Sequence, residues 1–400
     1  MKGIKKASIS YLSAVFALSL GSSILLPIIP FYIIDLHLSM SAFGAINSTS
    51  QALVSLVSFL MPILMPLIGY FRTFALGASL ILLSRLAYVG SVLLSGSLTA
   101  FAIGYLLSSL RMPVIFTSRT ALVAEYIPSK RRATAMGVVS AIAMLASCVG
   151  PYVGSYLYES LTVGYLGVFL LSLMVTNFSL VPLIPLTIED PTRKGKIVSL
   201  KEEVKFISRV TKLPKLRIAL SLFALDAFTW SLIGPFISIY YAKELKALPY
   251  ELATVTLITN VISIVMFPFS GAISDKVRQR VPFLALSEAI GVAYYMLILI
   301  AKDMKLIYVA SSLLALIITF WGPLAGTLIT ELAEEVDKSL VPSAISAWSS
   351  LRQVIRIPAS VLGGLLFDID PKLPFKIVIA LLLILTILLI TLLTEGEVKG

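Results

Sequence analysis

Residues 375–393, FKIVIALLLILTILLITLL, form an almost unbroken apolar run near the end of the chain. Roughly 20 apolar residues in an α-helix are needed to cross the hydrocarbon core of a bilayer. A strand of a membrane barrel would be about half as long and would alternate apolar with polar residues. The run therefore predicts a membrane-spanning helix.

Eleven further apolar segments precede this run. They cover approximately residues 8–34, 41–70, 74–94, 98–122, 133–158, 163–186, 218–241, 250–274, 281–301, 306–332 and 341–367. The composition agrees, because 58% of the 400 residues are hydrophobic and 13% are charged, whereas soluble domains have roughly 25% charged residues. We therefore predict an all-α integral membrane protein with twelve transmembrane helices and no sizeable soluble domain.

The basic residues indicate how the chain is oriented. The net charge of +11 does not predict nucleic-acid binding, because Lys and Arg lie between the apolar segments and not in one patch. The loops and termini on one side of the membrane hold 21 Lys and Arg residues, and the loops on the other side hold six. Since positively charged loops tend to stay in the cytoplasm, we predict a cytoplasmic-membrane protein with both termini inside the cell.

One long polar segment, residues 189–217, divides the predicted helices six and six. We therefore expect an N-terminal bundle over residues 1–188 and a C-terminal bundle over 218–400. Within the segment, Ser199 and Glu202 have the spacing of a capping box, and the residues that follow predict a short amphipathic helix on the membrane surface. A binding site for a regulatory partner is the alternative.

The two halves also share residues at a spacing of about 200 to 210 positions. The matched pairs are Pro27 with Pro235, Gly69 with Gly271, Glu125 with Glu331, and Gly154 with Gly363. Many membrane transporters consist of two such repeats. The pattern predicts two pseudo-symmetric six-helix bundles.

The loop after the eighth predicted helix carries a family resemblance. It reads GAISDKVRQR from Gly271 to Arg280, which resembles a loop signature of the major facilitator superfamily. The resemblance implies a polar latch between the halves, with an aspartate at a helix end beside basic residues. Its gating residues would be Gly271, Asp275, Lys276, Arg278 and Arg280. The alternative is a cytoplasmic loop whose aspartate only caps a helix.

Three other stretches bear on the same resemblance. In the first half the equivalent loop, Gly69 to Thr73, has Thr73 where the family has the aspartate. The fourth helix and its loop carry Arg111, Arg119 and Glu125, similar to the family's arginine-bearing helix, with Ile115 in place of a glycine.

The fifth helix contains Gly150, Pro151 and Gly154, which resembles the signature of drug/proton antiporters and implies a hinge or seal. Close packing of small residues explains the same pattern.

Ionisable residues deep in the apolar segments are candidate functional residues, because each costs at least about 2.5 kcal/mol to place in the bilayer. Asp226 lies eight residues into the seventh segment, at a depth of about 12 Å. It is a candidate proton site, or else a structural partner of an arginine. The central arginines are Arg111, Arg352 and Arg356, and their excess over Asp226 predicts an anionic group on the solute. For Arg352 and Arg356 the alternative is snorkelling or packing within one bundle.

Other polar residues receive supporting roles. Asn47 and Gln51 share a face of the second helix and could line a cavity, or simply pack. Arg85 and Glu288 occupy equivalent points in the third and ninth helices, which the family places at the periphery. With Arg119 and Glu125 they are expected to support the cavity charges from outside it.

These residues and the resemblance predict a secondary active transporter that moves a small solute by alternating access. We expect a proton-coupled protein, with efflux one possible direction and uptake or exchange of an anionic metabolite the alternative. A membrane receptor or lipid-modifying enzyme is the rival from another class. With a single cysteine, Cys148, and no phosphate-binding loop, we expect no enzyme activity, cofactor or metal. A working monomer is implied by the family.

Overall fold

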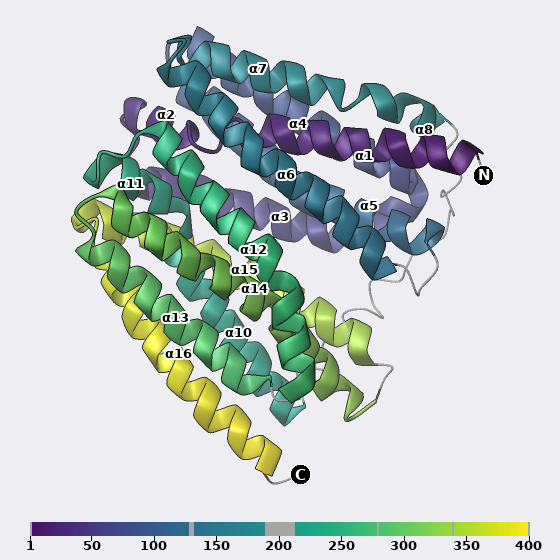
Figure 1. Cartoon of the computed structure of the whole chain (residues 1–400), viewed down its shortest axis with the longest axis vertical. Coiled ribbons are helices and arrows are strands. Elements are labelled where there is room, and N and C mark those ends of the chain that lie inside the picture. Colours follow the sequence, from purple (N-terminus) through teal and green to yellow (C-terminus); the bar gives the residue numbers. More distant parts are fainter. Residues whose placement is uncertain (1, 128–131, 189–212, 278–279, 338–339, 399–400) are drawn as a thin grey trace. The chain divides into compact units, whose positions relative to one another are not determined.

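The computed structural model describes residues 2–127, 132–188, 213–277, 280–337 and 340–398. Every regular element in these ranges is a helix (Figure 1). In the first half they are α1 (Lys2–Ser23), α2 (Ile29–Asp35), α3 (Met40–Ile68), α4 (Tyr70–Leu93), α5 (Leu98–Tyr126), α6 (Arg132–Glu159), α7 (Gly164–Phe178), η2 (Val181–Leu183) and α8 (Ile184–Ile188).

In the second half they are α10 (Pro214–Ile233), η3 (Gly234–Phe236), α11 (Ile237–Glu244), α12 (Pro249–Val277), α13 (Val281–Ile300), α14 (Met304–Glu334), α15 (Val341–Ile369) and α16 (Leu373–Val398). These bounds follow the predicted apolar segments closely. The amphipathic helix expected after Ser199 lies outside the described residues.

Ten spans in the described residues are long and apolar enough to cross a membrane, which confirms an all-helical membrane protein. Two predicted crossings do not meet that measure. In the first, the part of α1 whose side chains are described, Ile9–Ser23, is an apolar helix of 15 residues. The other, α15, carries Arg352, Arg356 and Asp368. The number of twelve crossings therefore stays a prediction.

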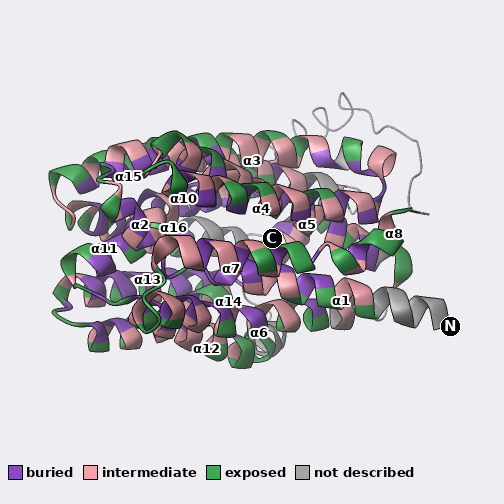
Figure 2. Cartoon of the chain, turned by 90° about the horizontal axis from the view of Figure 1, so that it is seen from above, coloured by how far each residue is buried: buried purple, intermediate pink, exposed green. Residues whose placement is uncertain are grey.

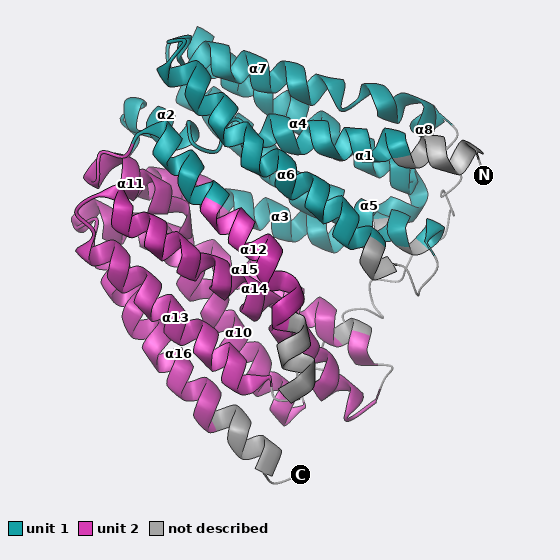
Figure 3. Ribbon diagram, in the orientation of Figure 1, with its two compact units in different colours: residues 1–38, 49–198, 248–257 teal, residues 39–48, 199–247, 258–400 magenta. Residues whose placement is uncertain are grey.

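The chain forms two compact units (Figure 3). Unit 1 comprises residues 1–38, 49–198 and 248–257, and unit 2 comprises residues 39–48, 199–247 and 258–400. The first residues of α3 thus belong to unit 2, and the first residues of α12 belong to unit 1. The predicted bundle boundaries at residues 188 and 218 stay a prediction.

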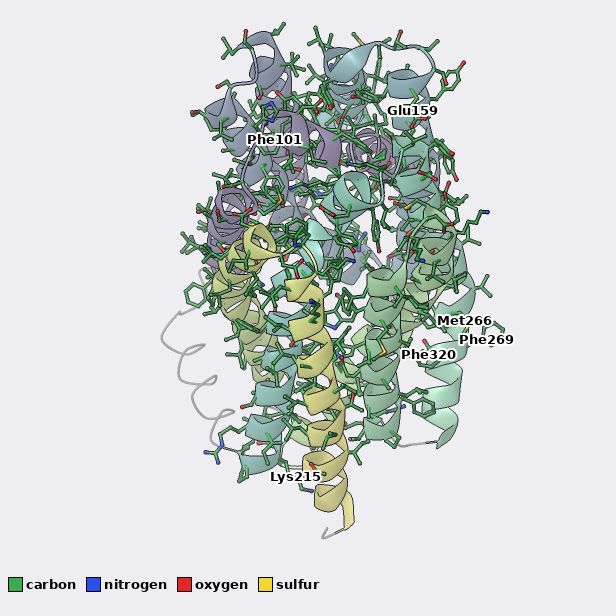
Figure 4. The ribbon with its side chains drawn as sticks, turned by 90° about the vertical axis from the view of Figure 1, so that its left-hand side faces the viewer. Phe101, Glu159, Lys215, Met266, Phe269 and Phe320 are labelled. Atoms are coloured by element: carbon green, nitrogen blue, oxygen red, sulfur yellow. The ribbon has the colours of Figure 1, made fainter. Side chains whose placement is uncertain are left out.

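Apolar side chains fill the inside of each unit, and many large apolar side chains are exposed as well. Figure 2 shows buried and exposed residues on the same helices. In unit 1, Phe74 and Ile81 belong to a buried core, and in unit 2 Leu284 and Ile329 do. Phe269 on α12 is 56% exposed and projects outward (Figure 4). Exposed apolar surface of this extent suits contact with lipid.

The first helix of each half is interrupted at the prolines that the repeat had paired. In the first half, a turn over residues 24–28 that contains Pro27 separates α1 from α2. In the second half, η3, which contains Pro235, separates α10 from α11. Proline has no N–H to give to the helix ladder, so the same break recurs at the same point of each repeat.

A second repeated pair, Gly154 and Gly363, marks close contact between the fifth and first helices of each half. A Cβ atom on Gly154 would meet the backbone oxygen of Ile24, just after α1. A Cβ atom on Gly363 would meet the backbone oxygen of Leu232 in α10. Glycine at both sites allows the backbones to approach closely.

We therefore expect Gly154→Ala to destabilise the protein by about 1–3 kcal/mol, because the new methyl group has to displace backbone. Gly137 lies on the same helix α6 and has open space around its Cα, so Gly137→Ala is expected to be neutral or stabilising. Thermal unfolding in detergent would measure both. Equal behaviour of the two variants would contradict the contact.

In unit 2, Asp368 near the end of α15 caps the start of α3. Its two carboxylate oxygens accept hydrogen bonds from the backbone N–H groups of Met40, at 2.9 Å, and Ser41, at 2.8 Å. Further along α3, Asn47 Nδ2 donates to Ser360 Oγ at 2.7 Å. Burial alone would raise the pKa of Asp368, but the hydrogen bonds from Ser41 and Met40 outweigh it and hold the pKa below its ordinary value.

This cap predicts a pH-dependent contribution to stability. Because the folded-state pKa is lowered, the contribution is present at neutral pH and is lost as the pH falls below about 4. We expect Asp368→Asn to cost about 1 kcal/mol at pH 7, because the amide oxygen can accept only one of the two backbone hydrogen bonds, and almost nothing in strong acid. Thermal unfolding of both proteins between pH 7 and pH 3 checks this. A constant difference across that range would contradict it.

Candidate functional site

Four ionisable side chains lie together inside unit 2. Asp226 comes from α10, Glu288 from α13, and Arg352 and Arg356 from α15. These helices and α14 pack side by side within the unit (Figure 1). Asp226 is only 2% exposed and Glu288 is fully buried, while both arginines are half-buried. We call these four residues the charge cluster.

The two carboxyl groups of the cluster interact directly. Asp226 and Glu288 lie within hydrogen-bonding reach of each other, and the indole of Trp230 reaches both. Trp321 Nε1 donates to Glu288 Oε1 at 2.5 Å. One oxygen of each carboxyl group, Asp226 Oδ1 and Glu288 Oε2, is buried without a hydrogen-bond partner. Two carboxyl groups in contact in a low-dielectric interior tend to share a proton.

Aromatic rings hold the first arginine of the cluster. The guanidinium carbon of Arg352 lies 4.7 Å from the ring centroid of Trp321 and 5.2 Å from that of Trp348, at cation–π distance. Phe223 packs edge-on against Trp321 with centroids 5.4 Å apart. These contacts fix the guanidinium without neutralising it.

Neither arginine forms an ion pair with a carboxylate within 4 Å in the part of the chain that the structure describes. Arg352 and Arg356 interact electrostatically with Asp226 at longer range, and both Nε atoms are buried without a hydrogen-bond partner. The two residues are one helical turn apart, so they share a face of α15. With one proton on the carboxyl pair, the cluster carries one excess positive charge.

The predicted latch is described only in part. The surroundings of Gly271, the side chains of Asp275 and Lys276, and the whole of Arg278 lie outside the described residues. Arg280 is buried, and its Nη2 lies 3.0 Å from Glu331 Oε1 of α14. Arg280 thus connects the start of α13 to α14 inside unit 2.

In unit 1, the residues expected to form a hinge or seal pack against the first helix. A Cβ atom on Gly150 would meet Ser23 Oγ, and Ser23 Oγ donates to the backbone oxygen of Ala146 at 3.1 Å. Pro151 is buried inside α6. Together with Gly154 they form a tight contact, which supports the packing interpretation of this motif. The gating role stays a prediction.

The other predicted site residues of unit 1 are spread over α3, α4 and α5. Arg111 of α5 lies within electrostatic reach of Arg85 of α4. Arg119 is half-buried beside Phe116, Glu125 is exposed and Gln51 is half-buried. The expected neighbourhood of Arg111 and Asp226 joins residues of different units and stays a prediction.

Arg72, in the loop of the first half that resembles the latch, binds the end of α8. Its Nε donates to the backbone oxygen of Thr187 at 2.9 Å, and its Nη2 donates to that of Ile188 at 3.2 Å. A cationic side chain that satisfies the last carbonyls of a helix is a common C-terminal cap. Thr73, which replaces the family's aspartate, donates to the backbone oxygen of Gly69 at 2.7 Å.

Sequence reasoning did not identify Trp321 as part of a site. Trp321 lies in the middle of α14, 17 residues after Met304, whereas tryptophan is enriched at membrane interfaces. A mid-helix tryptophan was the available signal. For Glu288, the sequence indicated the depth correctly but not its neighbour Asp226.

Comparison with known proteins agrees with this architecture. The family model described as Major Facilitator Superfamily matches residues 11–360, and a second match covers residues 219–399. None of the curated sequences compared with the chain matches it.

Three similar solved structures share the fold over nearly the full length of this chain. A point mutant of the nucleoside transporter NupG is 10% identical with a TM-score of 0.77, over 96% of this chain and 99% of that one. The peptide transporter POT in complex with sulfate is 13% identical with a TM-score of 0.76, over 98% and 94%. The human organic anion transporter MFSD10 (TETRAN) is 14% identical with a TM-score of 0.65, over 96% and 98%.

Proposed function

Because the chain belongs to the Major Facilitator Superfamily, a family of membrane transporters, we propose that it is a secondary active transporter that carries a small anionic solute together with a proton. The family assignment replaces the alternatives of a receptor or a lipid-modifying enzyme. The charge cluster of unit 2 is the observation that carries the proposal.

The carboxyl pair supports the proton part of the proposal. Asp226 and Glu288 are buried, interact with each other and lie deep within their helices. A shared proton there neutralises one of two adjacent negative charges, so its release needs a change in solvent exposure or in nearby charge. Alternating access exposes the carboxyl pair first to one side of the membrane and then to the other, which supplies such a change.

The arginines support the anionic solute. Arg352 and Arg356 offer guanidinium donors on one helix face without a close carboxylate among the described residues, and planar guanidinium groups suit carboxylate or phosphate oxygens. When the carboxyl pair holds a proton, the cluster has one positive charge in excess, which a monoanion would neutralise. Proton binding and anion binding therefore favour each other, as in a symporter.

Antiport of a cationic compound, the efflux alternative, requires proton and solute to exclude each other. The excess of arginine in the cluster disfavours a bound cation. We propose, from the distribution of Lys and Arg in the loops, that the protein acts in the cytoplasmic membrane with both termini inside. Alternating access of the two halves, with Asp275 and the residues around it as a latch, belongs to the same proposal.

The test is a flux assay with the purified protein in liposomes that contain a pH-sensitive dye. External anions from a panel of carboxylates and phosphate esters are added without a pH gradient. We expect at least one anion to enter and to acidify the interior at the same time, and a protonophore to abolish the dye signal. Solute movement that leaves the interior more alkaline would contradict symport and support exchange against protons. No movement of any anion, with export of cationic compounds, would contradict the anionic solute.

A further inference from the structure

Trp321 of α14 contacts both kinds of charge in the charge cluster. Its Nε1 donates a hydrogen bond to Glu288 Oε1 of α13 at 2.5 Å. The guanidinium carbon of Arg352, on α15, lies over the ring of the same indole, 4.7 Å from the ring centroid. Helix α14 packs against both α13 and α15. One rigid side chain therefore links a carboxyl group on one helix to a guanidinium group on another.

Packing keeps the Trp321 ring from turning away from these partners. The residue is 7% exposed and belongs to the buried core of unit 2. Phe223 packs edge-on against it with ring centroids 5.4 Å apart, and the centroid of the Trp348 ring lies 6.4 Å away. Because an indole is a rigid plane, a displacement of its N–H edge also moves the face that lies under Arg352.

The backbone that follows Trp321 allows a small shift of this kind. The next two residues are Gly322 and Pro323, both inside α14. Pro323 has no N–H to give to the backbone oxygen of Thr319, four residues earlier. The Cα of Gly322 has open space around it. A missing helix hydrogen bond beside open space lowers the cost of bending α14 at this point.

Protonation of Glu288 changes both contacts of Trp321. A hydrogen bond to an ionised carboxylate is roughly twice as strong as one between neutral groups, so proton uptake weakens the bond from Nε1. Linked polar interactions also polarise one another. An indole that donates to a carboxylate has a more electron-rich ring, which attracts the cation of Arg352 more strongly. Proton uptake thus loosens the hold of Trp321 on Arg352.

The ionisable side chains around the carboxyl pair come from three helices. They are Asp226 of α10, Glu288 and Tyr295 of α13, and Arg352 and Arg356 of α15. Helices α14 and α16, which pack against α13, carry ionisable side chains only near their ends. Arginine stays charged and tyrosine stays neutral at physiological pH. Proton exchange near Trp321 is therefore confined to the carboxyl pair.

We propose that Trp321 is a positioning residue that transmits the protonation of Glu288 to Arg352. With an ionised carboxylate, Trp321 holds the guanidinium group against its ring. With a protonated carboxyl pair, the guanidinium group is released to bind the solute. This role in transport rests on the proposed function and names the contact through which proton and anion favour each other.

The test is fluorine NMR of the full-length protein with 5-fluorotryptophan at its three tryptophan positions and no solute. All three, Trp230, Trp321 and Trp348, lie in unit 2, and phenylalanine substitutions assign their resonances. Trp348 is the reporter, because its ring centroid lies 5.2 Å from the guanidinium carbon of Arg352 and its Nε1 has no hydrogen-bond partner. We expect the Trp321 and Trp348 resonances to shift between about pH 5 and pH 9 with one common midpoint.

Trp321→Phe keeps an aromatic face for Arg352 but lacks the N–H. We expect it to reduce the pH-dependent shift of Trp348 at least about threefold, because the direct effect of the carboxyl charge falls with distance. Trp230→Phe is the matched control. It also removes an indole beside the carboxyl pair, but Trp230 packs against Tyr295, so the shift of Trp348 should remain. Arg352→Gln should abolish the shift of Trp348 and leave that of Trp321.

A Trp348 shift that survives in Trp321→Phe would overturn the proposal, since the carboxyl charge would then act directly. An equal loss in Trp230→Phe would overturn it too, because the effect would not be specific to Trp321. If Trp321→Phe does not fold, the protein without substitutions decides the question. Different midpoints for Trp321 and Trp348, or a Trp321 resonance that does not move, would then overturn the link.

The outcomes separate this link from the proposed transport function. A transmitted shift in a protein that moves no anion would contradict the proposed transport alone. Proton-coupled flux together with an unchanged Trp348 shift in Trp321→Phe would contradict the link alone.

Discussion

Asp226→Asn is expected to abolish accumulation of the anion against its gradient. With a pH difference of about two units and no membrane potential, a one-to-one symporter can concentrate its solute about 100-fold, since each pH unit corresponds to a factor of ten. Asparagine keeps the size of the side chain and its hydrogen bonding to Trp230 but cannot take up the proton. Accumulation should fall to about onefold, while exchange of labelled for unlabelled anion continues.

The measurement compares accumulation and exchange in the same liposomes. Glu288→Gln is expected to act in the same direction, because Glu288 lies beside Asp226 and shares its proton in the proposed mechanism. Glu335→Gln is the control, since Glu335 pairs with exposed Lys215 at 3.5 Å, where α10 begins (Figure 4). Normal accumulation by Asp226→Asn would place the coupling proton elsewhere.

Arg356→Gln is expected to raise the KM for anion exchange by about 10- to 100-fold, because it removes a charge-assisted contact worth about 1.5–3 kcal/mol. Arg352→Gln should have an effect at least as large, since it also removes the cation that Trp321 and Trp348 enclose. Lysine at position 356 should recover part of the affinity, because it restores charge without the planar donors.

Exchange kinetics at saturating and limiting anion concentrations separate affinity from turnover. Arg217→Gln serves as the control, because Arg217 lies exposed near the start of α10. An unchanged KM in both cluster variants, with normal protein levels, would show that the arginines only stabilise the bundle. That outcome would agree with the packing alternative for Arg352 and Arg356.

The sequence predicted the helices well because the length and apolarity of a membrane crossing are local properties. The paired prolines at residues 27 and 235 also had a local consequence, a break in the first helix of each half. The interruption between α7 and α8, at η2, has no counterpart in the last helix of the second half, because α16 is continuous. Helix α15 has reduced apolarity because it carries two arginines.

The candidate site was predictable in depth but not in its lateral contacts. Position along a helix follows from residue number at about 1.5 Å per residue, so Asp226 and the arginines of α15 were recognised as central. Which helix lies opposite depends on helix rotation and packing, which a single sequence does not encode in any short motif. Glu288 was therefore expected only to support the cavity charges, although it lies beside Asp226. The association of Arg111 with Asp226 joins residues of different units and stays a prediction.

The composition of the charge cluster has an electrical consequence. Two arginines, two carboxyl groups with one proton between them and a bound monoanion sum to zero, so the loaded cluster is neutral. A membrane voltage acts on a translocated charge with about 2.3 kcal/mol per 100 mV, but it exerts no net force on a neutral one. The loaded step would then respond to the difference in pH and hardly at all to voltage, so that a cell could depolarise without losing the solute it has gathered.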